Sequence, residues 1–135
     1  MQTLVTFVFK FLAALPLAWL HKLGNLLGSL GFRVLSKDRR RVFENMKLAG
    51  LNPTDEAVKK VFRETAKGGL ELPVAFFRRP EEIENLFVSV NGWEHVQTAL
   101  SAGEGLLFIT PHIGSYDLAG RYISQQLPFP LTAMY

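Results

Sequence analysis

The sequence predicts an α/β fold in which apolar N-terminal helices precede a βαβ-type sheet. Residues 3–20 and 23–35 are almost wholly apolar, as helices that attach to a membrane or pack in a core are. Residues 36–79 combine helical spacing of apolar side chains with helix-capping residues. Further along, the short apolar runs 86–90 and 106–110 flank a helical segment. That order is typical of a strand–helix–strand unit.

The length of the chain limits it to one well-sized core. Its 135 residues suffice for one domain but not for two. We expect a single α/β domain, of which residues 36–135 form the N-terminal part, preceded by a membrane-associated helical segment, 1–35. There is no cysteine, which excludes disulfides and thiolate metal sites. The histidines lack ligand-like spacing, so we expect neither a metal site nor a cofactor. These histidines are His21, expected at the membrane interface, His95, expected at the surface, and His112.

The apolar N-terminus favours membrane attachment. As a helix, residues 3–20 would rise about 27 Å, marginally enough to cross a bilayer. Lys10 places a charge near the middle of this run, at a cost of about 2.5–3.5 kcal/mol, and Pro16 should kink the helix. A cleaved signal peptide is disfavoured because residues 1–3 carry no basic side chain. A buried core helix stays open. Attachment by spanning or lying in the interface is favoured, because the basic cluster 37–41 follows and suits the cytoplasmic side.

Two helices are expected in the middle of the chain. Ser36 can cap the first, and Gly50 is well placed to stop it. Thr54 is the expected N-cap of the second. Gly68-Gly69 and Pro73 should break or bend this second helix. We expect the region to pack as a helical cap or base.

Strands and helices alternate in the remainder. Residues 86–90 are predicted to form a short strand and residues 93–100 a helix. Residues 106–110 form the second predicted strand, which is apolar on both faces and therefore central in a sheet. The crossover between the two strands should be right-handed. A helix over about 115–126 and a strand-like segment, 131–135, complete the pattern.

A histidine and an aspartate follow the second predicted strand. His112 and Asp117 can activate a hydroxyl group, because an imidazole titrates near neutral pH and a carboxylate can fix its tautomer. Gly114 permits a tight turn, and Ser115 is a candidate N-cap that places Asp117 in the first turn of a helix. Backbone amides there would favour a developing oxyanion. The alternative is a structural histidine and an aspartate that complements the helix dipole. Spacing alone does not decide between them.

These groups suit the attack of an alcohol on an acyl carbon. In open α/β sheets ligands bind beyond the carboxyl ends of strands, where His112 is expected. The sequence has no Gly-x-Ser-x-Gly elbow and no cysteine nucleophile. Direct transfer is therefore favoured over a covalent acyl-enzyme.

The segment His112-Ile113-Gly114-Ser115-Tyr116-Asp117 resembles the signature of the bacterial late acyltransferases of lipid A biosynthesis, the lauroyl and myristoyl transferases. Three further blocks resemble this family in the same order: Arg40-Arg41 with Asn45-Met46, residues 88–95, and residues 103–110. The resemblance implies a glycerol-phosphate-acyltransferase-like fold. It also implies transfer of a fatty acyl chain from an acyl carrier protein thioester, or acyl-coenzyme A, to a hydroxyl of a lipid A precursor. The expected location is the cytoplasmic face of the bacterial inner membrane.

The resemblance implies that His112 is the general base and Asp117 its partner. Candidate substrate-binding residues are Gly114, Ser115, Arg40 and Arg41. Two departures stand out. Asp117 occupies a position where many members carry glutamate. Family members are also about twice as long, in the range of one large domain, and continue past a position like Tyr135 with an Arg-Pro segment and more strands. The chain is therefore expected to be the N-terminal half of such a protein.

Other functions stay open beside this one. The chain can be a truncated, inactive membrane-associated fragment, whose sheet would expose unpaired edges. Its acyl acceptor can be another phospholipid or glycolipid. Nucleic-acid binding rests only on residues 39–41 and is not expected, because an apolar segment directly before them suits a lipid surface better.

Overall fold

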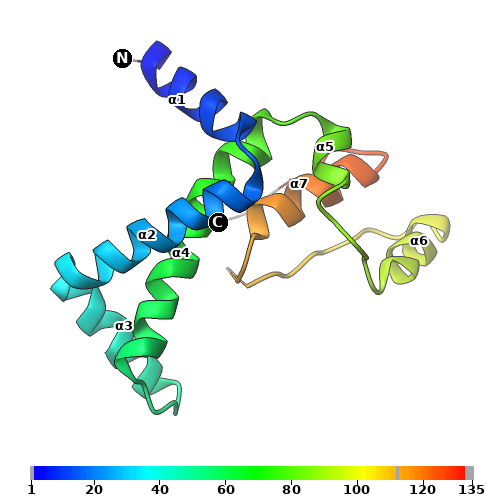
Figure 1. Cartoon of the computed structure of the whole chain (residues 1–135). Helices are drawn as coiled ribbons and strands as arrows, with labels where there is room; N and C mark the ends of the chain where they lie inside the picture. Colours follow the sequence, from blue (N-terminus) through cyan, green and yellow to red (C-terminus); the bar gives the residue numbers. More distant parts are fainter. Residues whose placement is uncertain (1, 112, 133–135) are drawn as a thin grey trace.

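The computed structural model describes residues 2–111 and 113–132, which form seven helices and no strand (Figure 1). The helices are α1 (Gln2–Ala14), α2 (Leu17–Val34), α3 (Ser36–Leu48), α4 (Asp55–Phe77), α5 (Pro80–Glu84), α6 (Trp93–Ser101) and α7 (Tyr116–Gln126). The described part of the chain is all-helical. The predicted α/β class, with its βαβ sheet of the glycerol-phosphate-acyltransferase-like fold, is therefore wrong.

Residues 86–90 and 106–110, both predicted as strands, form the connections on either side of α6 (Figure 1). Neither pairs with another strand within the described residues. Of the predicted strand-like segment 131–135, residues 131 and 132 are not in a strand, and the remainder lies outside the described residues. Leu107 and Ile109 expose 76% and 88% of their surface, and Val88 is fully exposed. A strand requires a neighbour that satisfies its backbone N–H and C=O groups. The apolar runs supplied strand propensity but no such neighbour.

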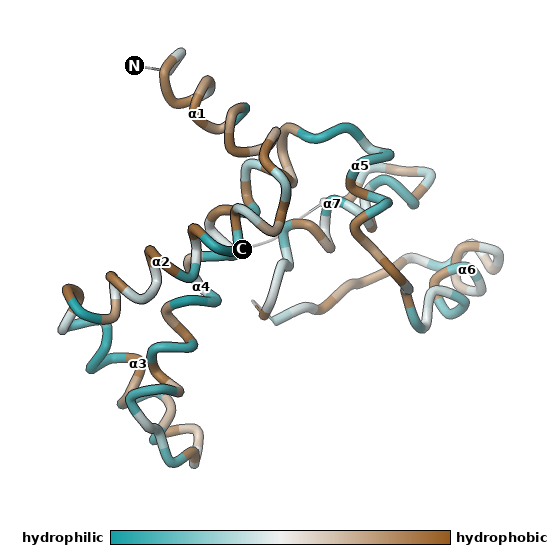
Figure 2. The backbone as a smooth tube through the Cα atoms, viewed as in Figure 1, coloured by the Kyte–Doolittle hydropathy of each residue, from teal (hydrophilic) through white to brown (hydrophobic). Residues whose placement is uncertain are grey.

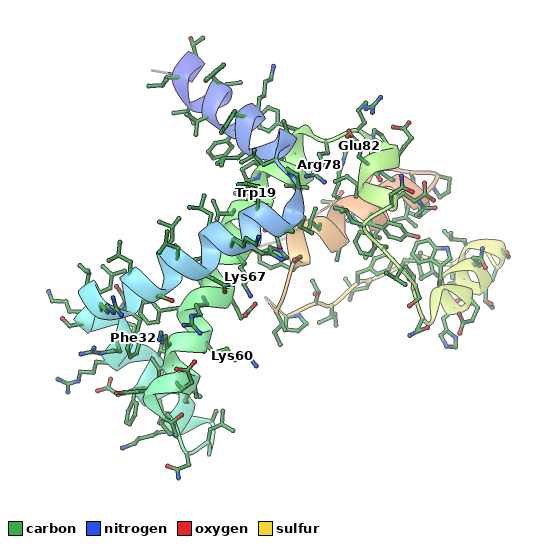
Figure 3. The ribbon with its side chains drawn as sticks, viewed as in Figure 1. Trp19, Phe32, Lys60, Lys67, Arg78 and Glu82 are labelled. Atoms are coloured by element: carbon green, nitrogen blue, oxygen red, sulfur yellow. The ribbon has the colours of Figure 1, made fainter. Side chains whose placement is uncertain are left out.

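The N-terminal apolar region forms two helices that meet at Pro16. α1 and α2 are bent by 116° at this break, so the predicted kink is confirmed. Arg78, at the end of α4, satisfies carbonyl groups at the break (Figure 3). Its Nε donates to the Ala13 carbonyl at 2.8 Å, and its Nη2 donates to the Leu15 carbonyl at 2.6 Å. Among the described helices, none alone is long and apolar enough to cross a membrane, whereas α1 and α2 as a bent pair pass by length and composition.

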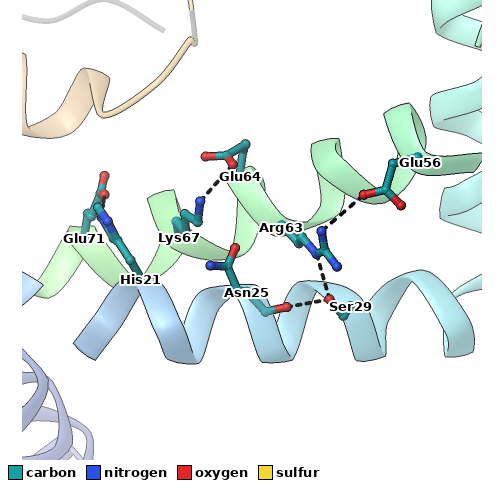
Figure 4. A network of polar contacts seen from close by, with 8 residues as sticks. All are labelled: His21, Asn25, Ser29, Glu56, Arg63, Glu64, Lys67 and Glu71. Atoms are coloured by element: carbon teal, nitrogen blue, oxygen red, sulfur yellow. Dashed lines mark hydrogen bonds and ion pairs between the residues drawn. The ribbon is translucent and has the colours of Figure 1, made fainter. Parts of the chain in front are cut away.

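α2 packs antiparallel along α4 through close backbone contact (Figures 1 and 4). A Cβ at Gly24 would lie 2.8 Å from Lys67 Cγ, and one at Gly28 would lie 2.4 Å from Arg63 Cα. Glycine is therefore required at both positions. Polar side chains border the seam: Arg63 Nε donates to Ser29 Oγ at 2.8 Å.

Local signals placed the ends of α3 and α4 with mixed success. The Thr54 hydroxyl accepts from the Ala57 amide at 3.2 Å, which confirms the predicted N-cap. Gly50 has a left-handed φ of 76° after α3, as expected for a helix stop. Ser36, however, is the first residue of α3 and provides no side-chain cap. α4 also continues through Gly68, Gly69 and Pro73. Of the predicted break or bend, the break is therefore wrong and the bend stays a prediction.

The core lies where α2, α4, α5 and α7 meet. Its buried members are Leu20, Val74, Ala75, Ile83 and Leu118. Leu118 belongs to the first turn of α7. The core therefore fixes the start of α7 against α4.

Hydrophobic residues predominate in α1 and recur along α2 (Figure 2), and many of them are exposed. Phe7 and Trp19 expose 69% and 65% of their surface. Only one side of these helices is covered, at residues such as Leu20 and Gly24. The division at residue 35 stays a prediction, although α2 packs directly on α4.

Candidate active site

An open cavity of about 820 Å³ lies between α4 and the start of α7. Residues 57–72 of α4 contribute one wall, Met46 of α3 adds to the lining, and residues 113–118 contribute the other wall. Most of the motif predicted to carry the chemistry therefore lines this cavity. His112 lies outside the described residues.

A sharp turn leads from the extended connection into α7. The Ile113 amide donates to the Pro111 carbonyl at 2.8 Å. Gly114 has a left-handed φ of 63°, and a Cβ there would meet nothing within 4 Å. The backbone conformation, rather than crowding, therefore requires glycine. Ser115 is the N-cap position of α7, which confirms the predicted helix start. Asp117 lies half-buried in the first turn and lines the cavity.

A buried carboxylate, Glu71, lines the same cavity as Asp117 and connects three elements. It lies on α4 and is 6% exposed. The Ser115 hydroxyl donates to its Oε2. His21 Nε2 of α2, which lies against Glu71 in Figure 4, donates to its Oε1 at 2.5 Å. His21, whose side chain is 38% exposed, thus pairs with a buried acid, and its expected position at a membrane interface stays a prediction.

Sequence reasoning missed Glu71, although a signal was available. Glu71, Val74 and Ala75 are spaced as one helical face, and all three are buried. A lone acid at a core position of an amphipathic helix indicates a buried polar partner, because an unpaired buried carboxylate is costly. Which residues would supply that partner could not be predicted.

Charges of both signs line the wall formed by α4. Lys67 Nζ donates to Glu64 Oε1 at 2.8 Å. This hydrogen bond is the main reason why the pKa of the Glu64 carboxyl is lowered, with smaller contributions from the charges of Lys67 and Lys60. The Lys60 side chain points away from α2 (Figure 3), and it lines the cavity.

Arg40 and Arg41 lie on α3, outside the cavity wall. Arg40 Nε donates to Glu44 Oε1 at 2.7 Å, and this bond raises the pKa of Arg40. Arg41 Nη1 donates to Asp38 Oδ1 at 3.4 Å. The arginine side chains are 82% and 75% exposed. The structure does not bring them to Asp117, and their role in substrate binding stays a prediction.

Within residues 2–111 and 113–132, no group of three His, Asp or Glu side chains could hold a metal ion.

The family described as bacterial lipid A biosynthesis acyltransferase matches the chain over residues 1–135. The chain belongs to this family. Comparisons with curated proteins and with solved structures found no match. For a bacterial lipid A biosynthesis acyltransferase, the cavity beside residues 113–118 is the candidate site of acyl transfer.

Proposed function

We propose that this protein transfers a fatty acyl chain from an acyl carrier protein thioester to a hydroxyl group of a lipid A precursor. The family match over residues 1–135 carries the proposal. The cavity supports it, because its volume of about 820 Å³ is in the range of ligand sites and its wall includes the motif segment 113–118.

In the proposed reaction His112 is the general base and Asp117 orients it. His112 takes the proton from the acceptor hydroxyl as the hydroxyl oxygen attacks the thioester carbonyl carbon. The C–O bond forms, the C–S bond breaks, and the departing thiolate receives the proton from His112. The position of Asp117, half-buried on the cavity wall, supports this assignment.

Backbone groups at the start of α7 are proposed to stabilise the oxyanion of the tetrahedral intermediate. Amides at a helix N-terminus point outward and carry partial positive charge. Gly114 and Ser115 are the proposed substrate contacts through their backbone, because they lead into α7 and line the cavity. Arg40 and Arg41 are proposed to bind anionic head groups, for which their exposure leaves them accessible.

The proposed location is the cytoplasmic face of the bacterial inner membrane. A lipid acceptor requires access to a membrane. The exposed apolar side chains of α1 and α2, such as Phe7, Phe11 and Trp19, support attachment there.

Mass spectrometry of lipid A from cells with and without the gene tests the proposed function. We expect the cells that lack it to accumulate a precursor that is short of one acyl chain, and the wild-type gene to restore that chain. Unchanged lipid A together with altered phospholipids would assign a different acceptor. Unchanged lipids of every class would contradict acyl transfer.

A further inference from the structure

We propose that Glu71 is a positioning residue for acyl transfer. From the buried face of α4 it holds the turn that carries Asp117, through the Ser115 hydroxyl, while His21 holds Glu71 from α2. This inference rests on the proposed function, because it assigns Glu71 to the same site.

The burial of Glu71 argues against a role in stability alone. A carboxylate that is 6% exposed loses hydration, and its hydrogen-bond partners must offset that loss. Apolar replacements of buried ion pairs are often neutral or stabilising. The neighbouring positions on this face, Val74 and Ala75, are apolar core residues. A buried acid at the wall of the cavity is better explained by the group that it orients.

Both oxygens of Glu71 are engaged within the protein. Oε1 accepts from His21 and Oε2 accepts from Ser115. Glu71 is therefore poorly placed to take a proton from a substrate. Its connection to the reacting groups runs through Ser115, which lies three residues after His112 and two before Asp117.

The side chain of Ser115 binds Glu71 rather than its own helix. Serine at an N-cap position commonly accepts a hydrogen bond from its own helix. Ser115 makes no such bond, and its hydroxyl donates to Glu71 instead. On the other side of Asp117, Leu118 is buried in the core. The backbone on both sides of Asp117 is thus held in place, by the hydrogen bond between Ser115 and Glu71 before it and by the buried Leu118 after it.

Steady-state kinetics of the full-length gene product tests this inference, with a lauroyl thioester of acyl carrier protein and a lipid A precursor as substrates. We expect Glu71→Leu and Ser115→Ala to lower kcat about 10–100-fold, because small misplacements of reacting groups cost rates of this order. The KM for the thioester should stay unchanged. Ser115→Thr keeps the hydroxyl and should retain most of kcat. The matched control is Glu56→Leu on the exposed start of α4, which should leave kcat unchanged.

Coupling between the two positions gives a second readout. If Glu71 acts through Ser115, the double variant should be no slower than Glu71→Leu alone. If the double variant instead showed the product of the two single losses in kcat, the inference would be overturned. A Glu71→Leu enzyme as fast as the control would also overturn it. Should Glu71→Leu fail to fold, equal rates for Ser115→Ala and Ser115→Thr would overturn it.

His112→Ala separates this inference from the proposed function. If His112→Ala stays active, the proposed general base is wrong. If His112→Ala is inactive and Glu71→Leu matches the control, only the positioning role of Glu71 fails.

Discussion

Asp117 reaches the cavity because neighbouring residues impose one backbone path. Gly114 adopts a left-handed conformation that other residues rarely take. Ser115 then begins α7, and Leu118 anchors its first turn in the core. These contacts leave the Asp117 carboxylate half-buried at the cavity wall.

The charge of Asp117 should matter more than its length. Asp117→Asn keeps the shape but loses the charge that stabilises an imidazolium, so kcat should fall about 10²–10⁴-fold. Asp117→Glu should retain activity within about tenfold, because it keeps the carboxylate and adds only one methylene. Kinetics of both purified full-length variants provide the measurement. An Asp117→Asn enzyme as fast as the wild type would exclude the orienting role.

The ion pair on the cavity wall predicts a small pH dependence of stability. Lys67 lowers the pKa of the Glu64 carboxyl below its ordinary value of 4.5. The ion pair between Glu64 and Lys67 therefore stabilises the folded chain fully above pH 4.5. This stabilisation is lost as the pH falls through the lowered pKa of Glu64 in the folded chain. Thermal melting should show Glu64→Gln less stable than wild type at pH 7, by under about 1 kcal/mol for so exposed a pair. A difference that grows in acid would contradict the assignment.

At the scale of elements, local chemistry predicted the helices. Thr54 predicted the start of α4, Gly50 the end of α3, and Ser115 the start of α7, because caps and stops depend on adjacent residues. The break at Pro16 was predictable for the same reason. The break expected at Pro73 does not occur, because Pro73 and its neighbours on α4 are packed in the core and the helix stays continuous.

Non-local pairing could not be predicted. Residues 106–110 have strand composition, but pairing depends on a neighbour that the segment itself does not specify. The partners of Glu71 lie 50 residues away at His21 and 44 residues away at Ser115. No spacing rule connects such positions. The motif segment was found because its residues are contiguous. The hydrogen bonds of Glu71 to His21 and Ser115 were not, because these residues are far apart in the sequence.

The contact between α2 and α4 should tolerate no added methyl group. An alanine at Gly28 would place its Cβ 2.4 Å from Arg63 Cα and 2.6 Å from the Phe62 carbonyl. Gly28→Ala should therefore lower the free energy of unfolding by about 1–3 kcal/mol. Gly120→Ala in α7 has open space and should raise it by about 0.4–1 kcal/mol. Denaturant unfolding measures both, and equal stabilities would contradict the close approach.

At the scale of the whole molecule, one junction organises the chain. The break between α1 and α2, the end of α4, α5 and α7 share a single core. The cavity lies on the α7 side of α4. Many of the hydrophobic residues along α1 and α2 (Figure 2) are exposed. The exposed apolar surface of α1 and α2 and the cavity between α4 and α7 are thus connected through one core.

This arrangement predicts that α1 contributes to membrane binding. Phe7→Ser with Phe11→Ser should weaken binding to vesicles of anionic phospholipid at least about tenfold, because burying one phenylalanine contributes about 1.5–3 kcal/mol. Leu48→Ser is the matched control, since Leu48 is an exposed apolar residue at the end of α3. Co-sedimentation measures the binding. Equal losses in the two proteins would exclude a specific role of α1.

Acyl transfer with His112 as the general base is tested by comparing the rates of purified full-length protein and its His112→Ala variant. The wild type should acylate a lipid A precursor from an acyl carrier protein thioester. His112→Ala should lower that rate about 10²–10⁴-fold, while circular dichroism shows the helices retained. Near-normal transfer by the folded His112→Ala variant, or no transfer by the wild type, would contradict it.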